Sequence, residues 1–263
     1  MSALVLTAAE GEGFEAPGSA DFWQPLIGDG AFAITRAAIV MALTVGLLCL
    51  VLLRATRRMT VVPGRGQFAA ESTYGLVRNS LARDIIGSHD FLRFVPLLFT
   101  MFALILVNNL AGIVPFVQFP TMSRIGFPVA LTLVVFFIYH LVGIRKKGFI
   151  GYHKAMVPPG LPGFIVPFIF FLELLTFYVT RPLTLALRLF ANMFAGHLLL
   201  LVFILGGEYM LLHGGPALKV MSIGAFGLGI VMTFFELLVQ FLQAYIFTLL
   251  SALYIAGSLA DEH

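Results

Sequence analysis

Charged side chains are scarce in this sequence. Aspartate, glutamate, lysine and arginine make up 11% of its 263 residues, while hydrophobic residues make up 60%. A soluble domain carries about 25% charged residues. The shortage of charge therefore excludes an ordinary soluble domain, and the apolar surplus predicts an all-α polytopic membrane protein whose solvent is lipid.

Cysteine is almost absent as well. The single cysteine, Cys49, lies inside the first apolar run, so neither a disulfide framework nor a thiolate metal site can be built from it. The sequence has no Gly-x-x-x-x-Gly-Lys phosphate loop, no Ser/Lys or paired-Asp hydrolytic constellation and no His-rich metal cluster. We expect no cofactor, no metal, no bound nucleotide and no enzymatic activity in this chain itself.

The basic residues are not gathered on one face. Most of the 16 lysines and arginines lie just beyond apolar runs, where they report membrane topology, so we expect no nucleic-acid partner. The first residues carry Glu10, Glu12 and Glu15 but lack the basic region of a signal peptide. We interpret residues 1–30 as an acidic outer tail and 31–263 as a single membrane domain.

Three apolar runs predict ordinary transmembrane spans, at residues 31–53, 91–117 and 127–147. Basic clusters follow the first span at Arg54 and end the third at Arg145 to Lys147. Basic ends are cytoplasmic under the positive-inside rule. This topology predicts an outer N-terminus and a cytoplasmic C-terminus, and the lack of an organelle-targeting segment favours a bacterial plasma membrane.

Residues 67–90 contain too many polar groups to span a membrane. Leu76, Val77, Leu81 and Ile85 recur at helical spacing, with charges elsewhere on the wheel. This pattern predicts an amphipathic helix at the cytoplasmic interface, with a soluble linker helix as the alternative. A Gly/Pro-rich connection at residues 148–163 is expected to be non-helical.

Two apolar segments are too long for ordinary spans. Residues 164–206 and 217–260 are each more than 40 residues long, which as helices would be over about 60 Å, against a hydrocarbon core of about 30 Å. Either each segment folds into two spans or each is one steeply tilted helix. The glycines from Gly206 to Gly215, with Pro216, predict a turn, so we favour a hairpin of two long tilted helices.

Ionisable and amide side chains lie inside these two segments. Arg188 is far from both ends of its segment, and an arginine near the middle of a membrane helix costs about 2.5–3.5 kcal/mol. Asn192, Arg181, Thr184 and Ala195 share its stripe. The second segment carries one polar stripe of Glu236, Gln240, Gln243 and Tyr254. A buried ion pair or interhelical polar contacts that only stabilise the bundle would be the structural alternative.

An antiparallel hairpin centred on Gly214 to Pro216 places these polar groups opposite one another. This register predicts three pairs, which are Arg188 with Gln243, Asn192 with Gln240, and His197 with Glu236. His197 lies well round the helix from Asn192, so we expect it to face a different neighbour or a cavity.

The residue types at this level suit ion transfer. Arg188 stays protonated and can act only as a fixed positive barrier that stabilises a passing carboxylate. His197 and Glu236 both titrate and could pass a proton. No mobile carboxylate is evident in this chain, so we expect it on a partner.

Three motifs resemble the F-type ATP synthase subunit a family over most of the chain beyond Phe68. They are residues 181–193 (RPLTLALRLFANM), 242–247 (LQAYIF) and 108–115 (NNLAGIVP). The resemblance implies a proton-conducting stator with two aqueous half-channels, packed against a rotating ring of c subunits and held by b- and delta-type stalk subunits within membrane lipid.

The same resemblance implies residue roles. Arg188 would separate the half-channels, with Asn192 and Gln243 as its polar neighbours. His197 and Glu236 match the outer relay pair with acid and imidazole exchanged. Further half-channel candidates are Gln240, Glu173, Asn108, Asn109 and Tyr254. A Na⁺-translocating version of the same subunit and a self-contained secondary transporter remain the alternatives, although the transporter would usually show internal repeats.

Overall fold

The computed structural model describes residues 18, 25–27, 34–57, 59–114, 119–157 and 160–260. Most of the predicted outer tail, together with Pro158 and Pro159 of the predicted connection, lies outside these ranges. A short antiparallel ribbon of β1 (Pro25–Ile27) and β2 (Ile34–Thr35) precedes the helices.

The described chain is otherwise built from helices, as its apolar runs predict. Four of them are long and apolar enough to cross a membrane, counting Val166–His213 as one, and Val95–Ala111 is a shorter apolar helix. In order along the chain, the helices are α1 (Arg36–Arg57), α2 (Arg65–Gly75), the π-helix η3 (Leu76–Arg83), α3 (Asp84–Ile86), η4 (Phe91–Arg93), α4 (Val95–Ala111), η5 (Thr121–Ser123), α5 (Gly126–Lys154), α6 (Val166–Leu175), the π-helix η6 (Thr176–Thr180), α7 (Arg181–His213) and α8 (Pro216–Leu259).

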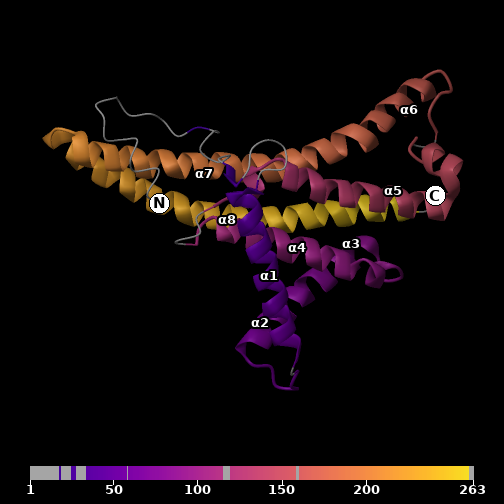
Figure 1. Cartoon of the computed structure of the whole chain (residues 1–263). Coiled ribbons are helices and arrows are strands. Elements are labelled where there is room, and N and C mark those ends of the chain that lie inside the picture. Colours follow the sequence, from indigo (N-terminus) through magenta and orange to yellow (C-terminus); the bar gives the residue numbers. More distant parts are fainter. Residues whose placement is uncertain are drawn as a thin grey trace.

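The two long segments form a hairpin, in which α7 continues the stack of α6 and η6 and α8 returns alongside it. Figure 1 shows α7 and α8 side by side along the length of the molecule, with α1 running across their direction. At 1.5 Å per residue, α8 alone is roughly 65 Å long, about twice the thickness of a hydrocarbon core. Within the described residues, no non-helical loop divides either Val166–His213 or Pro216–Leu259 into two spans, which favours the tilted-helix alternative.

The predicted turn between the long helices is shorter than expected. Helix α7 continues through Gly206 and Gly207 to His213, and the non-helical link is only Gly214 and Gly215. A Cβ atom at Gly207 would lie 3.3 Å from Ala225 and Phe226 of α8. This glycine therefore serves close helix packing, which the sequence pattern does not distinguish from a turn.

The range of α5 holds two helical pieces that meet at a kink. Gly148, with φ 75° and ψ 165°, is non-helical, so the first piece ends at the basic cluster as predicted and a second short piece runs to Lys154. The apolar run ends at the basic cluster, but residues 149–154 beyond the kink are helical too. The predicted non-helical connection therefore starts about two helical turns later than expected.

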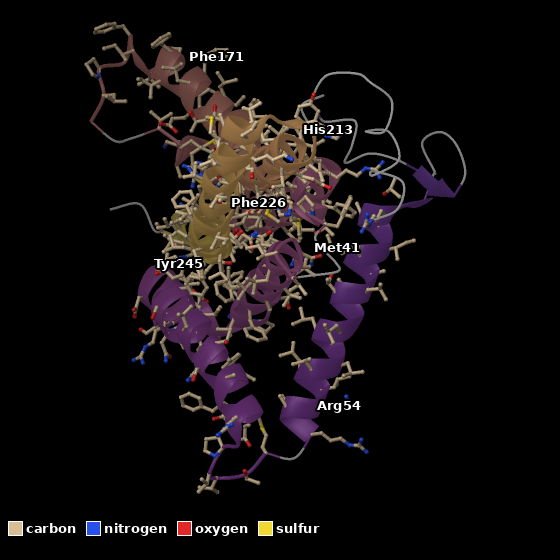
Figure 2. The ribbon with its side chains drawn as sticks, turned by 90° about the vertical axis from the view of Figure 1, so that its left-hand side faces the viewer. Met41, Arg54, Phe171, His213, Phe226 and Tyr245 are labelled. Carbon is tan, nitrogen blue, oxygen red and sulfur yellow. The ribbon has the colours of Figure 1, made fainter. Side chains whose placement is uncertain are left out.

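The predicted interfacial helix packs against protein. Its apolar residues Val77 and Leu81 are fully buried in a core shared with Leu98 of α4, Leu189 of α7 and Phe247 of α8. The apolar face is thus covered by other helices of the chain, and the position at the cytoplasmic interface stays a prediction. Figure 2 shows α1 with Arg54 at its far end, away from the hairpin.

Candidate functional site

Arg188 lies on the open face of α7. Its neighbours Leu185 and Leu189 are buried in the core, while Arg188, Asn192 and Ala195 are exposed. Among the residues that the structure describes, the Arg188 guanidinium has neither a hydrogen bond nor an ion pair. An intramembrane arginine therefore points out of this chain without an internal counter-charge.

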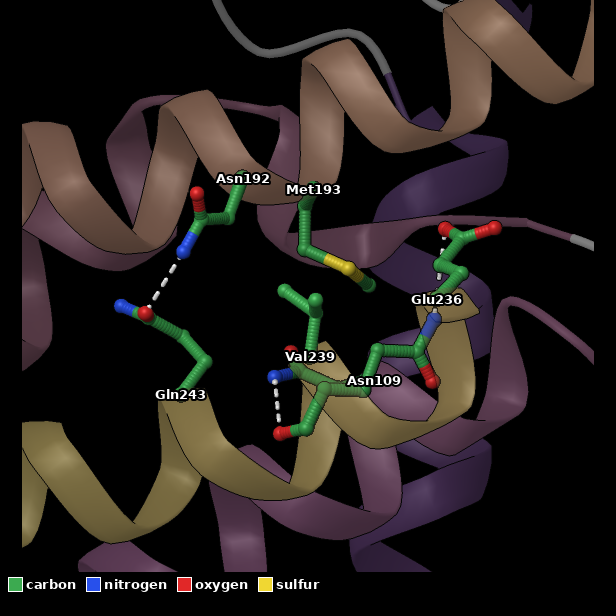
Figure 3. A pocket seen from close by; sticks show the side chains of 7 residues that line it. Asn109, Asn192, Met193, Glu236, Val239 and Gln243 are labelled. Carbon is green, nitrogen blue, oxygen red and sulfur yellow. Dashed lines mark hydrogen bonds between the residues drawn. The ribbon is translucent and has the colours of Figure 1, made fainter. Parts of the chain in front are cut away.

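Asn192 connects the open face to α8. Its Nδ2 donates to Oε1 of the buried Gln243 at 2.7 Å, and the two side chains point toward each other in Figure 3. The predicted partner of Asn192 was Gln240, and that of Gln243 was Arg188. Neither pairing is observed, because Asn192 bonds Gln243, which lies three residues beyond Gln240 on the same polar stripe of α8.

His197 and Glu236 form the pair that the hairpin register predicts. Nδ1 of His197 lies 2.5 Å from Oε1 of Glu236, and both side chains are about 95% buried. His197 also faces a neighbour outside the hairpin, as expected, because its Nε2 lies 3.0 Å from the carbonyl oxygen of Gly112 at the end of α4.

A small pocket opens beside this pair, with room for about one water molecule. Four buried polar atoms of its lining residues lack a hydrogen-bond partner in the described structure: Asn109 Oδ1, Glu236 Oε2, Gln240 Oε1 and Gln243 Nε2. Buried polar groups of this kind are normally satisfied. These four atoms are therefore the polar groups that the pocket leaves available for hydrogen bonding. Its lining residues are Asn109, Asn192, Met193, Glu236, Val239, Gln240 and Gln243.

The two adjacent asparagines have different surroundings. Asn109 donates to the backbone carbonyl of Gln240 at 3.4 Å and lines the pocket. Asn108 accepts from Thr44 and Thr121 at 2.7 and 3.1 Å, and it donates to the Leu104 carbonyl. Asn108 thus ties α1, α4 and η5 together, away from the pocket.

The remaining candidates lie apart from the pocket. The guanidinium of Arg181 lies over the rings of Phe177, at 3.5 Å, and Tyr254, at 5.2 Å. Glu173 is half-exposed on α6, roughly 20 Å along the helical stack from Arg188. The structure does not bring Tyr254 or Glu173 together with the His197–Glu236 pair.

Sequence reasoning missed three residues of this region. Met193 and Val239 line the pocket as apolar walls, which an apolar pattern alone cannot single out. Gly112 contacts His197 through its backbone carbonyl. Its place in the 108–115 motif was the signal that could have pointed to it.

Comparison with known proteins finds one family that matches most of this chain. The family model described as ATP synthase A chain matches residues 38–256. The chain is 48% identical to "ATP synthase subunit a" of Nocardioides sp., covering 100% of this chain and 99% of that relative. It is 41% identical to "ATP synthase subunit a" of Pseudarthrobacter chlorophenolicus, with 100% of both chains covered.

A third relative, "ATP synthase subunit a" of Arthrobacter sp., is 43% identical over 79% of this chain and 78% of its own length. The family match covers the apolar helices, the Arg188 motif and the polar pocket. This multi-span membrane chain belongs to the ATP synthase A chain family.

Proposed function

We propose that this chain is the proton-translocating stator subunit of a rotary ATP synthase, with Arg188 between two aqueous half-channels. The unpaired, exposed guanidinium of Arg188 carries this proposal. An arginine at membrane depth is costly unless a counter-charge approaches it. A carboxylate on a partner supplies that charge and is held ionised while it stands beside Arg188.

The partner is a ring of c subunits whose carboxylates pass the open face of α7. Apolar side chains flank Arg188 on this face, including Leu187 and Leu183, which are 40% and 52% exposed. Such a surface suits a neighbouring membrane helix that slides past, because apolar side chains form no lasting hydrogen bonds or ion pairs with it. Stalk subunits of the b and delta type would hold the chain still, and it would perform no bond chemistry itself.

Protons reach the ring through the polar pocket on one side. The imidazole–carboxylate pair of His197 and Glu236 can accept and release a proton, which favours H⁺ over Na⁺ as the coupling ion. Asn192 and Gln243 continue the polar track from the pocket to the open face. On the other side, Glu173 on α6 is the acid of the second half-channel.

The orientation follows from the basic helix ends. Lys146 donates to the backbone carbonyl of Leu259 at 2.6 Å, so the end of α8 lies beside the basic cluster of α5. Under the positive-inside rule both are cytoplasmic. The N-terminus before α1 is then outside, and the chain resides in a bacterial plasma membrane.

The proposal is tested by ATP-driven proton pumping in inverted vesicles that hold the assembled complex with Arg188→Ala. We expect pumping to fall to background, because an alanine cannot displace the proton from a ring carboxylate. Co-purification of the ring and the stalk establishes assembly. Arg54→Ala, which removes an exposed arginine at the end of α1, is the matched control and should pump like the parent.

Pumping by Arg188→Ala near the parental rate would contradict the proposal. Repeating the parental assay in Na⁺-free medium separates the two coupling ions. Undiminished pumping is expected there, and strict dependence on Na⁺ would show the sodium version instead.

A further inference from the structure

The hydrogen bonds of His197 define which of its two nitrogens carries a proton. Nε2 lies 3.0 Å from the carbonyl oxygen of Gly112. A carbonyl oxygen can only accept, so Nε2 must be the donor in this contact. In the neutral imidazole, Nδ1 is then the bare nitrogen, and it is the one that faces Oε1 of Glu236 at 2.5 Å.

This arrangement gives the pair a single mobile proton. In one state the proton is on Nδ1 and the imidazolium donates to the Glu236 carboxylate. In the other state it is on Oε1 and the acid donates to a neutral imidazole. When the proton moves from His197 to Glu236, the Nδ1–H bond breaks and an O–H bond forms on Oε1, and the reverse transfer restores the Nδ1–H bond. The second imidazole proton stays on Nε2 throughout.

The proton can leave the pair on only one side. Oε2 of Glu236 is buried, has no partner among the described residues, and belongs to a residue that lines the pocket. Asn109 Oδ1 and Gln240 Oε1, also without partners, are further acceptors of that lining. His197 does not line the pocket, and its Nε2 points at Gly112.

Gly112 is also sterically required. A Cβ atom at this position would lie 2.7 Å from Cε1 and 3.1 Å from Nε2 of His197. The imidazole makes one contact through each nitrogen, with Glu236 and with Gly112. It therefore cannot move away from an added Cβ atom without losing one of these contacts. Only glycine therefore allows its own carbonyl to come this close to the ring.

We propose that Gly112 is a positioning residue of the proton path: its carbonyl fixes His197 as the Nε2–H tautomer, so that Glu236, through Oε2, is the group that exchanges protons with the pocket. This inference deepens the proposed function and rests on it. His197 then acts as a proton store behind Glu236 and is not a through-going link in the chain of proton transfers.

The tautomer is measured directly by solid-state ¹⁵N NMR of the assembled complex labelled with ¹⁵N-histidine. His197→Gln identifies the signals of His197 by difference. We expect Nε2 to be protonated at every pH at which the complex is intact, with only Nδ1 changing. A neutral His197 with a bare Nε2 and a protonated Nδ1 would overturn the inference.

The positioning role is tested with Gly112→Ala in the same vesicles. We expect ATP-driven pumping to fall about tenfold or more, because displacing a proton-transfer group by a fraction of an ångström is costly. The ¹⁵N signals of His197 should also lose their fixed Nε2–H pattern. Gly46→Ala is the matched control, since a Cβ there meets nothing within 4 Å, and it should pump normally.

Parental pumping by Gly112→Ala, or an unchanged His197 spectrum in that variant, would contradict the role of Gly112. If Gly112→Ala fails to assemble, the NMR of the parent still decides the tautomer. The two proposals can fail separately. A failed Arg188 test contradicts the stator proposal, whereas the NMR result tests only the tautomer of His197 and the role of Gly112.

Discussion

At the scale of single residues, Glu236 is the centre of the site. Its Oε1 contacts Nδ1 of His197 and accepts from Nε2 of Gln240 at 3.3 Å. Its Oε2 is the buried oxygen left for the pocket. The two oxygens of this carboxylate thus have different surroundings, which is the basis of the proposed split between proton storage at Oε1 and proton exchange at Oε2.

Glu236→Gln keeps this shape but removes the exchangeable proton. We predict that ATP-driven pumping falls by about 100-fold or more, the lower range of what a positioned acid–base group contributes. The assay is the vesicle measurement described for Arg188. Glu208→Gln, which changes an exposed acid on the same hairpin, serves as the control, and comparable pumping by the two variants would contradict the prediction.

At this scale the sequence predicted the residue types but not all of the contacts. The His197–Glu236 pair could be predicted because a hairpin register relates residues that lie in two regular helices. The Asn192–Gln243 bond was missed because a shift of one helical turn changes partners along the same polar stripe. The 108–115 motif could have pointed to Gly112, but not to its contact with His197, which depends on how the end of α4 packs against α7.

At the scale of elements, hydropathy predicted the helices well and their ends less well. The second long segment is the single helix α8, and the first is a continuous helical stack of α6, the π-helix η6 and α7. Their junction was placed too early because Gly207 looks like a turn residue but packs against α8. Similarly, a second helical piece of α5 follows its basic cluster, beyond the kink at Gly148. Glycine at a helix contact and glycine at a turn have the same sequence signal.

The bend at Gly148 gives a prediction for α5. A φ of 75° with ψ of 165° is a conformation open essentially to glycine alone. Gly148→Ala should lower the free energy of opening of residues 149–154 by about 1–3 kcal/mol. Hydrogen exchange of these amides in the assembled complex measures it.

Gly151→Ala is the matched control, because its added Cβ makes only an ordinary 3.6 Å contact with Lys147. It should leave exchange unchanged or slow it slightly. Equal exchange in the parent and in Gly148→Ala would show that the bend does not depend on glycine.

At the scale of the whole molecule, the hairpin of α7 and α8 gives the chain two distinct faces. The inner face buries Leu185, Leu189 and Phe247 against α4, α5 and η3. The outer face presents Arg188 amid apolar side chains. The composition could predict a membrane bundle with buried polar groups, but only the packed structure shows that Arg188 points outward while Glu236 points inward.

Under the proposed function, this division would form a barrier between two water-accessible regions. The positive charge of Arg188 would repel an unaccompanied proton that approaches along the open face, and a ring carboxylate would have to pass it to carry charge further. Each elementary charge that crosses the membrane supplies about 2.3 kcal/mol per 100 mV. A stator therefore has to prevent protons from crossing without turning the ring.

The most direct test is the passive proton conductance of vesicles that hold the assembled complex with Arg188→Ala, at an imposed membrane potential and without ATP. The account predicts conductance clearly above that of the parent and of Arg54→Ala, together with the loss of pumping. A conductance equal to that of the parent, in an intact complex that still pumps, would show that Arg188 does not separate the two half-channels.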